Sequence, residues 1–382
     1  MKILYISDFL YGDLSGANTA AKAHLNTLKE IAGEKNVDVI ALTGCNNIDC
    51  EDITFKSYSN KLLLYINSFL GYTTYMNSFI VRKILKIIQK GNYNIIFIDN
   101  SIYGKLSKKI KIKFPEKIVF SFYHDVKQEL CKSWKNKSPW YKKKVYDSMM
   151  SNELINQRYC DINITLNNRE SYLYEKYYKK SPEAELSIYM KIDEKLINNK
   201  METIGETLKI LFVGGYYYPN VNGITWFVNN IESKINIPIE LTIIGNGMEK
   251  LSEVGFPSWV RIFGRVESLA EYYEKCDLVI EPIFEGGGMK VKTAEALGYG
   301  KMILATKESL IGYLENIPKE YLGRLVYECE IIDDFVEALN NVYRNRQYLY
   351  KYNKELREIF NKHYSNEYAK ILLSNLIEKY KK

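Results

Sequence analysis

Short, almost purely apolar runs alternate with longer segments of helical periodicity along the sequence, and this alternation restricts the fold more than any other feature. Such runs are typical of parallel strands buried on both faces, and the segments between them are then crossover helices. We predict strands at 2–7, 37–43, 94–99, 117–125 and 162–167 in the first half, and at 208–215, 239–247, 259–266, 277–283 and 302–306 in the second. This order predicts an α/β chain with two doubly wound, parallel-sheet domains.

The domain boundaries follow from the place where this order is lost. A chain of 382 residues is too long for one ordinary core. Residues 180–206 show neither periodicity, so we expect an N-terminal domain at 1–190, a linker at 191–206 and a C-terminal domain at 207–366. The predicted helices are 17–32, 76–90, 138–159, 223–234, 269–276, 290–297, 333–346 and a region from 348 to the end.

The positive charge of the chain is concentrated in one segment. The formal net charge is +7, whereas residues 101–150 carry 13 lysines against four acidic residues, a local excess of 13 − 4 = +9. A basic face attracts nucleic acid, anionic lipid or an acidic substrate, and a solvated helix face explains the lysines equally well. No motif that alternates aromatic and basic residues accompanies them, which argues against nucleic-acid binding.

Three further observations concern membranes and redox state. Residues 62–81 carry no charge and are long enough to span a bilayer, but their Asn, Ser and Thr content favours buried or membrane-facing helices of a soluble domain. The N-terminal MKILYISDFL is typical of a first strand and not of a signal peptide. Six cysteines without metal-ligand spacing, and only three histidines, argue against structural zinc and favour the reducing cytoplasm.

Glycines follow the predicted strands where a ligand would bind. Open α/β sheets bind ligands outside the carboxyl ends of their strands. The glycines at such ends are Gly12, Gly16, Gly214, Gly215, Gly245, Gly247, Gly264, Gly286, Gly287 and Gly288. Most belong to the second half, which is therefore the predicted nucleotide domain. No GxGxxG opens a first βαβ unit and no GxxxxGK[ST] is present, so nicotinamide and P-loop chemistry are disfavoured.

The segment 281–300, EPIFEGGGMKVKTAEALGYG, predicts an anion-binding turn. A glycine turn that leads into a helix offers free N–H groups, and the helix dipole adds partial positive charge. Lys290 and Lys292 lie in the first turn, where cations are unfavourable unless an anion binds. Glu295 follows Lys292 by one turn on the same face, where it could accept from ribose hydroxyls. An ordinary βα connection, with Glu295 on a solvated face, fits the same residues.

Two other strand ends carry residues capable of chemistry. His124 and Asp125 close the predicted strand 117–125, and a histidine there could move a proton. A hydrogen-bonded structural histidine is the alternative. Arg265 follows Gly264 and could meet a phosphate or a base, or be an ordinary surface arginine.

The sequence resembles the family 4 glycosyltransferases of the GT-B fold (glycosyl transferases group 1), especially bacterial polysaccharide and lipopolysaccharide enzymes. The resemblance is strong over 207–306 and thin over 44–115. It is carried by LKILFVGGYYYPNVNGITWFV, TIIGNG, VRIFGRV and CDLVIEPIFEGGGMKVKTAEALGYGKMILAT. The N-terminal ISDFLYGDLSGANTAAKAHLNTL fits the first strand and glycine loop of the family.

The resemblance implies two Rossmann-like domains that face each other across a cleft, with the last helix, 367–382, crossing back to the first domain. It implies a nucleotide-sugar donor, a UDP- or GDP-sugar, on the C-terminal domain and a glycan or lipid-linked acceptor on the other. It implies neither metal nor cofactor, and retention of anomeric configuration. Glu295 matches the glutamate that holds the ribose, Lys292 suits the diphosphate, and His124 matches a histidine beside the reacting sugar. The remaining expected donor-site residues are Gly16, Gly214, Gly215, Gly245, Arg265, Gly287, Gly288 and Lys290.

The chain departs from the family pattern at two places. The first glutamate of the Glu-x7-Glu motif should stand at position 287, which is Gly287; Glu285, two residues earlier, is the candidate catalytic replacement. The basic clamp after the first C-terminal strand is also absent, so Lys290, Lys292 or Arg265 would have to carry that charge.

We therefore expect a cytoplasmic glycosyltransferase of surface polysaccharide synthesis. Its lysine-rich 105–144 region and the 62–81 segment could bring it to the anionic inner face of the cell membrane. A sugar-nucleotide epimerase of the same fold and a non-catalytic partner subunit of a glycosyltransferase remain as alternatives.

Overall fold

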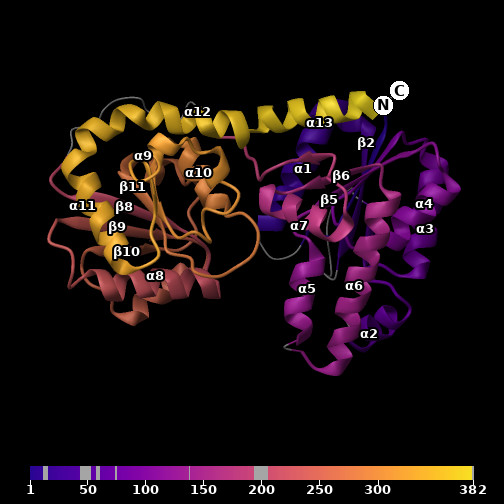
Figure 1. Ribbon diagram of the computed structural model, residues 1–382, viewed down its shortest axis with the longest axis horizontal. Coiled ribbons are helices and arrows are strands. Elements are labelled where there is room, and N and C mark those ends of the chain that lie inside the picture. Colours follow the sequence, from indigo (N-terminus) through magenta and orange to yellow (C-terminus); the bar gives the residue numbers. More distant parts are fainter. Residues whose placement is uncertain are drawn as a thin grey trace. The chain divides into compact units, whose positions relative to one another are not determined.

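A computed structural model of the chain describes residues 1–11, 16–43, 53–56, 61–73, 75–136, 138–192 and 205–380. Its internal contacts divide the chain into two units (Figure 1). Unit 1 comprises Met1–Ser187 and Ala369–Lys382, and unit 2 comprises Ile188–Tyr368. Most of the predicted linker, 191–206, lies outside the described residues.

Unit 1 contains a seven-stranded parallel sheet in the order β3-β2-β1-β4-β5-β6-β7. Its strands are β1 (Ile3–Ser7), β2 (Val37–Thr43), β3 (Ile53–Lys56), β4 (Ile95–Ile98), β5 (Ile118–Tyr123), β6 (Ile162–Thr165) and β7 (Ala184–Glu185). In the centre, Ile3 of β1 pairs with Val37 of β2 and with Ile95 of β4. The strand order reverses between β1 and β4, so their carboxyl ends flank the place where such sheets bind ligands.

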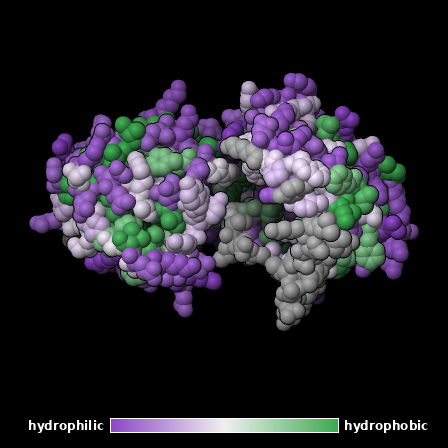
Figure 2. Space-filling view, turned by 90° about the horizontal axis from the view of Figure 1, so that it is seen from below, coloured by the Kyte–Doolittle hydropathy of each residue, from purple (hydrophilic) through white to green (hydrophobic). Residues whose placement is uncertain are grey.

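The helices of unit 1 pack on this sheet, as α1 and α7 do, or on one another, as α2 and α5 do on α6. They are α1 (Gly16–Ala32), α2 (Lys61–Phe69), α3 (Ser78–Gly91), α4 (Gly104–Lys113), α5 (Lys127–Asn136), α6 (Trp140–Tyr159), α7 (Asn168–Tyr178) and, from Ala369 on, α13 (Asn366–Tyr380). In α3, Ile80 and Ile84 join the core on Leu4 and Ile40. The side chain of Asn77 begins this helix by accepting from the N–H groups of Phe79 and Ile80. On the face shown in Figure 2, hydrophobic groups lie among mostly hydrophilic side chains.

The uncharged segment 62–81 includes all of α2 except its first residue, Lys61, and the start of α3, as predicted for helices. Its polar residues link it to neighbouring chain: Thr73 Oγ1 donates to the Ile102 carbonyl (2.7 Å), and Asn67 Nδ2 donates to the Met76 carbonyl. No helix in the described ranges is both long and apolar enough to cross a membrane.

Unit 2 contains a six-stranded parallel sheet in the order β10-β9-β8-β11-β12-β13. Its strands are β8 (Leu208–Val213), β9 (Ile239–Ile244), β10 (Val260–Phe263), β11 (Leu278–Glu281), β12 (Met302–Ala305) and β13 (Val326–Glu328). Its helices are α8 (Tyr218–Ile231), α9 (Ala270–Lys275), α10 (Val291–Gly298), α11 (Ile332–Leu349) and α12 (Asn353–His363). The order reverses between β8 and β11, which places the ligand-binding edge at their carboxyl ends.

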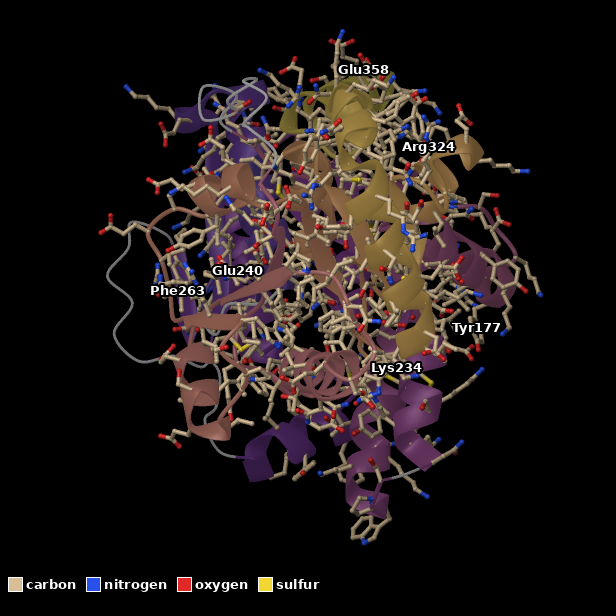
Figure 3. The ribbon with its side chains drawn as sticks, turned by 90° about the vertical axis from the view of Figure 1, so that its left-hand side faces the viewer. Tyr177, Lys234, Glu240, Phe263, Arg324 and Glu358 are labelled. Atoms are coloured by element: carbon tan, nitrogen blue, oxygen red, sulfur yellow. The ribbon has the colours of Figure 1, made fainter. Side chains whose placement is uncertain are left out.

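Polar contacts hold the outer helix α11 in unit 2. Lys234, after α8, forms an ion pair of 2.5 Å with Asp333, and Arg324 donates to the Tyr348 hydroxyl at 2.9 Å (Figure 3). Short 3-10 helices complete the chain at Glu34–Asn36, Met248–Val254, Leu314–Asn316, Lys319–Tyr321 and Tyr350–Tyr352.

All ten predicted strands are present, and the predicted helix at 223–234 begins earlier, at Tyr218. Pro219 lies in the first turn of α8, where the missing N–H has no intrahelical partner to lose. Position 223, inside the helix, requires glycine because a Cβ there would stand 1.8 Å from the Pro282 carbonyl oxygen. Pro219 therefore serves helix initiation, and Gly223 serves close packing.

Candidate functional site

The unit 2 site is built on glycines at the carboxyl edge of its sheet. Gly214 and Gly215 follow β8, and Gly245 follows β9. A Cβ on Gly245 would stand 1.8 Å from the Gly214 carbonyl oxygen, so this close approach requires glycine. The turn after β11 then brings 282–290 to the same edge.

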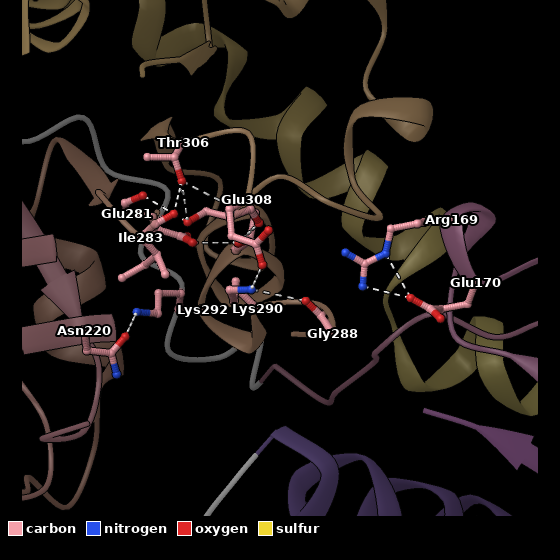
Figure 4. A network of polar contacts seen from close by, with 12 residues as sticks. Arg169, Glu170, Asn220, Glu281, Ile283, Gly288, Lys290, Lys292, Thr306 and Glu308 are labelled. Atoms are coloured by element: carbon pink, nitrogen blue, oxygen red, sulfur yellow. Dashed lines mark hydrogen bonds and ion pairs between the residues drawn. The ribbon is translucent and has the colours of Figure 1, made fainter. Parts of the chain in front are cut away.

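Lys292 bridges the two sides of the switch point. It lies in the first turn of α10, and its Nζ donates to Asn220 Oδ1 at 2.8 Å (Figure 4). Asn220 Nδ2 in turn donates to the Gly215 carbonyl at 2.9 Å. A Cβ on Gly214 would be 3.1 Å from Lys292 Nζ, which places the ammonium group beside the β8 glycines.

The charge of Lys292 is not neutralised by an ion pair. Among the described residues, no carboxylate lies within 4.0 Å of its Nζ. Burial lowers the pKa of Lys292 below its usual value, although Glu281 acts in the opposite direction. Lys292 Nζ also lies 4.5 Å from the centre of the Phe212 ring. A partly buried cation whose partners are an amide and an aromatic ring is completed electrostatically when an anion binds beside it.

Lys290 has a different environment from Lys292. Its Nζ pairs with Glu308 Oε1 at 3.0 Å and donates to the Gly288 carbonyl at 3.2 Å. Gly288 has φ 65°, a left-handed conformation that glycine adopts without strain. Lys290 therefore holds the glycine turn in shape, and its charge is already paired.

Gly287 and Glu285 lie on the exposed part of this turn. A Cβ on Gly287 would meet nothing within 4 Å, so this position stands in open space. Glu285 is exposed, as is Arg265 after β10.

Glu295 lies one helical turn beyond Lys292. Its Oε2 accepts from the Tyr273 hydroxyl at 3.2 Å, and the Tyr273 ring stacks on Tyr299 with centroids 4.5 Å apart. Burial raises the pKa of Glu295 to about 7. This carboxyl group is therefore held by one hydrogen bond at the edge of the site, and it changes protonation near neutral pH.

Glu281, at the end of β11, was not among the predicted site residues. It is fully buried; Thr293 Oγ1 donates to its Oε2 at 2.8 Å, while its Oε1 has no hydrogen-bond partner among the described residues. Burial raises the pKa of Glu281 above its usual range, and Lys292 partly offsets this. The signal in the sequence was a carboxylate that closes the apolar run LVIE.

In unit 1, His124 follows β5 and faces a buried carboxylate. Its Nε2 lies 3.2 Å from Asp99 Oδ1, and the same oxygen contacts His24 Nδ1 at 3.0 Å. Asp99 Oδ2 accepts from the hydroxyls of Tyr5 (2.8 Å) and Ser7 (3.2 Å). Asp99 therefore joins the ends of β1 and β4 to both histidines.

The electrostatics of Asp99 favour its ionised form. Burial would raise its pKa, but His124 and His24 hold the pKa below its usual value. The His124 ring also contacts Phe9 and Phe122 edge-on, with centroids 4.7 Å away in each case. Its orientation is thus fixed on three sides. Asp99 was missed because the apolar run IIFID was taken only as a strand.

The remaining predicted residues are placed as follows. Gly16 is the exposed first residue of α1, and the loop before it, including Gly12, lies outside the described residues. Asp125 Oδ1 pairs with Lys127 Nζ at 2.5 Å.

Four cysteines, Cys131, Cys160, Cys276 and Cys329, are buried free thiols; Cys45 and Cys50 are not described. The described residues contain no cluster of three His, Cys, Asp or Glu side chains that could hold a metal ion.

Comparisons with known proteins agree with this architecture. Residues 207–345 match the family model Glycosyl transferases group 1. No curated protein matches the sequence. The family model tests the predicted family resemblance in unit 2. The solved structures described next test the predicted fold class in both units.

Three solved structures illustrate the likeness in fold. The apo lipopolysaccharide outer core galactosyltransferase WaaB is 15% identical, with a TM-score of 0.67 and coverage of 99% of this chain and 100% of its own. Alr3699/HepE of Anabaena, in complex with UDP and glucose, is 12% identical, with a TM-score of 0.68 and 99% of each chain covered. WaaG, a glycosyltransferase involved in lipopolysaccharide biosynthesis, is 12% identical, with a TM-score of 0.66 and 97% and 99% covered. Both predictions are confirmed: residues 207–345 form a glycosyl transferases group 1 domain, in a chain with the two-domain GT-B fold.

Proposed function

We propose that this chain transfers a sugar from a nucleoside diphosphate sugar to a glycan or lipid-linked acceptor in surface polysaccharide synthesis. The observation that carries the proposal is Lys292, a cation without an ion-pair partner among the described residues, held between the β8 glycines and the start of α10. HepE, whose structure holds UDP and glucose, has the same fold. A diphosphate is the anion that this arrangement suits.

The donor diphosphate would lie on the N-terminus of α10. Free N–H groups there, together with the Gly287-Gly288 turn and Lys292, supply positive charge without a metal ion. Metal-independent transfer is therefore part of the proposal. Glu295 would accept from the ribose hydroxyls, since it follows Lys292 by one turn and has only the Tyr273 hydrogen bond to exchange.

The reaction breaks the bond between the sugar C1 and the diphosphate oxygen and forms a bond from C1 to an acceptor hydroxyl oxygen. The acceptor hydroxyl releases its proton to water, and the nucleoside diphosphate leaves with the extra negative charge. Lys292 and the helix N-terminus stabilise that charge where it develops. His124 is proposed beside the reacting sugar, with Asp99 fixing its ring, and retention is the proposed outcome.

The test is a panel of UDP-, GDP- and ADP-sugars incubated with the purified chain, with and without bacterial glycan or lipid acceptors. We expect release of nucleoside diphosphate from one donor, without added metal and in the presence of EDTA. The absence of both turnover and nucleotide binding would refute the proposal.

A non-catalytic partner subunit is the second candidate function. The open space at Gly287, where the family has a carboxylate, favours it. Such a subunit would bind no donor and would co-purify with an active glycosyltransferase. An epimerase of the same fold would convert the donor alone, so product analysis without acceptor separates it from a transferase.

We also propose that the chain works in the cytoplasm at the inner face of the cell membrane, where lipid-linked acceptors are found. The lysine excess of residues 101–150 supports this location.

A further inference from the structure

One surface of unit 1 combines exposed apolar side chains with lysines that form no ion pair with any described residue. It is formed by α2 and by the helical hairpin of α5 and α6, which Figure 1 shows side by side. Asn152 of α6 donates to the Gly71 carbonyl at 2.9 Å, and Ser148 donates to the Tyr72 carbonyl at 2.8 Å. These bonds fix the end of α2 against α6. We call this region, with Ile66, Phe69, Leu70, Trp140 and Lys142, Lys143 and Lys144, the hairpin surface.

The apolar residues of the hairpin surface are unusually exposed. Relative exposure is 58% for Phe69, 64% for Leu70 and 76% for Trp140. Lys144 Nζ lies 6.0 Å from the centre of the Phe69 ring, which brings α6 and the end of α2 together. Trp140 precedes Lys144 by four residues and therefore shares its helix face. Large side chains grouped in this way mark an interaction surface and not ordinary scatter.

Lysines dominate the charge of the hairpin surface. The sequence from 132 to 144, KSWKNKSPWYKKK, contains six lysines and no acidic residue. Lys135 is neutralised by Asp147 at 2.6 Å. By contrast Lys142, Lys143 and Lys144 are exposed on the first turn of α6. The surface is therefore basic as well as apolar.

We propose that the hairpin surface docks on an anionic lipid bilayer, with Trp140, Phe69 and Leu70 entering the headgroup region. Tryptophan and lysine at the edge of apolar groups are the composition of membrane interfaces, and the lysines complement anionic headgroups. A protein partner is less suited, because lysine is depleted from protein–protein interfaces. The proposal sharpens the membrane contact of the proposed function by assigning it to α2, α5 and α6 and not to the lysines of α4.

The test is co-sedimentation of the full chain with vesicles of phosphatidylcholine that contain either no phosphatidylglycerol or about 40% of this anionic lipid. We expect binding only to the anionic vesicles and weakening by salt. Since each lysine near an anionic surface contributes about fivefold in affinity, replacing Lys142, Lys143 and Lys144 by alanine should weaken binding roughly a hundredfold. No sugar donor is needed, so failure here is distinct from failure of the transferase proposal.

The helix α4 supplies matched controls in the same unit. Lys108, Lys109 and Lys113 are exposed, and their triple alanine variant should retain binding within about threefold. For the apolar part, Trp140→Ser should weaken binding at least about tenfold, whereas Ile112→Ser, at 67% exposure on α4, should not. Absence of vesicle binding, or equal losses in the α4 variants, would overturn the proposal. Circular dichroism checks that each variant is folded.

Discussion

Replacing Lys292 by methionine should weaken nucleotide binding without destabilising the free protein. Methionine keeps the apolar stem of the side chain and removes Nζ, whose partner is Asn220 Oδ1 at 2.8 Å. The two effects have opposite signs because Nζ is unfavourable in the free site and favourable once a diphosphate is bound. This sign difference separates a binding role from a structural one.

The magnitudes follow from the environment of Nζ. Removing one partner of a desolvated charge pair costs about 2–4 kcal/mol, which is roughly a 30- to 1000-fold increase in Kd for the nucleotide. In the free protein, a partly buried cation without an ion pair among the described residues is replaced by an apolar group, so we expect the free energy of unfolding to change by about 0 to 2 kcal/mol in favour of the variant. The melting temperature should stay constant or rise by a few degrees, about 2–4 °C per kcal/mol for a domain of this size.

The assay pairs calorimetric titration of UDP, GDP and ADP with thermal unfolding in the absence of nucleotide. Lys290→Met is the matched control, because Lys290 Nζ already pairs with Glu308 at 3.0 Å. Removing Nζ from Lys290 leaves Glu308 unpaired, so Lys290→Met should lower the melting temperature while changing the nucleotide Kd little. The reasoning is refuted if Lys292→Met unfolds earlier than the native chain while its nucleotide Kd is unchanged.

Four further predictions follow from the same contacts. Gly214→Ala should weaken nucleotide binding about tenfold, because its Cβ would stand 2.9 Å from Asn220 Nδ2, whereas Gly215→Ala, with its nearest neighbour at 3.7 Å, should bind normally in the same titration. Glu295→Gln should raise the nucleotide Kd by roughly tenfold. The exposed Glu285→Gln is the control and should leave Kd unchanged. It should lower turnover only if Glu285 replaces the glutamate that the family has at the position of Gly287. Burial raises the pKa of Glu295 to about 7, so between about pH 5 and 7 the folded state keeps a proton that the unfolded chain has lost, and the free energy of unfolding falls as the pH rises. In urea unfolding, the stability of Glu295→Gln should therefore increase relative to that of the native chain over this interval. A stability difference that does not change with pH would contradict this. Asp99→Asn should lower turnover more than donor affinity. The variant should be less stable than the native chain at pH 7, and this difference should shrink below about pH 4. The lowered pKa of Asp99 stabilises the fold at pH values above the pKa of this group in the unfolded chain, and the contribution is lost as the pH falls further.

The strands of both sheets could be predicted because their apolar runs are read directly from the sequence. The strands that were missed are short and lie at sheet edges: β3, β7 and β13, with Ala184–Glu185 of β7 only two residues long. At an edge, pairing depends on the neighbouring strand and less on local pattern. The start of α8 was missed because Pro219 begins the helix and because Gly223 is needed for its close approach to Pro282, the residue after β11.

The site was predicted in part because a glycine turn before a helix has a local signature. No local sequence signature distinguishes Lys290 from Lys292. It depends on Glu308 and Asn220, which lie 18 and 72 residues away in the sequence. Asp99 and Glu281 were missed for a similar reason, because an acidic residue at the end of an apolar run is a common strand terminus until its buried partners are seen.

The most direct measurement is a crystal structure of the chain with the nucleoside diphosphate that binds in titration. The account predicts the diphosphate at the start of α10, with an oxygen within about 3 Å of Lys292 Nζ and a ribose hydroxyl on Glu295. Nucleotide bound elsewhere, or an α10 N-terminus left without nucleotide at saturating concentration, would contradict it.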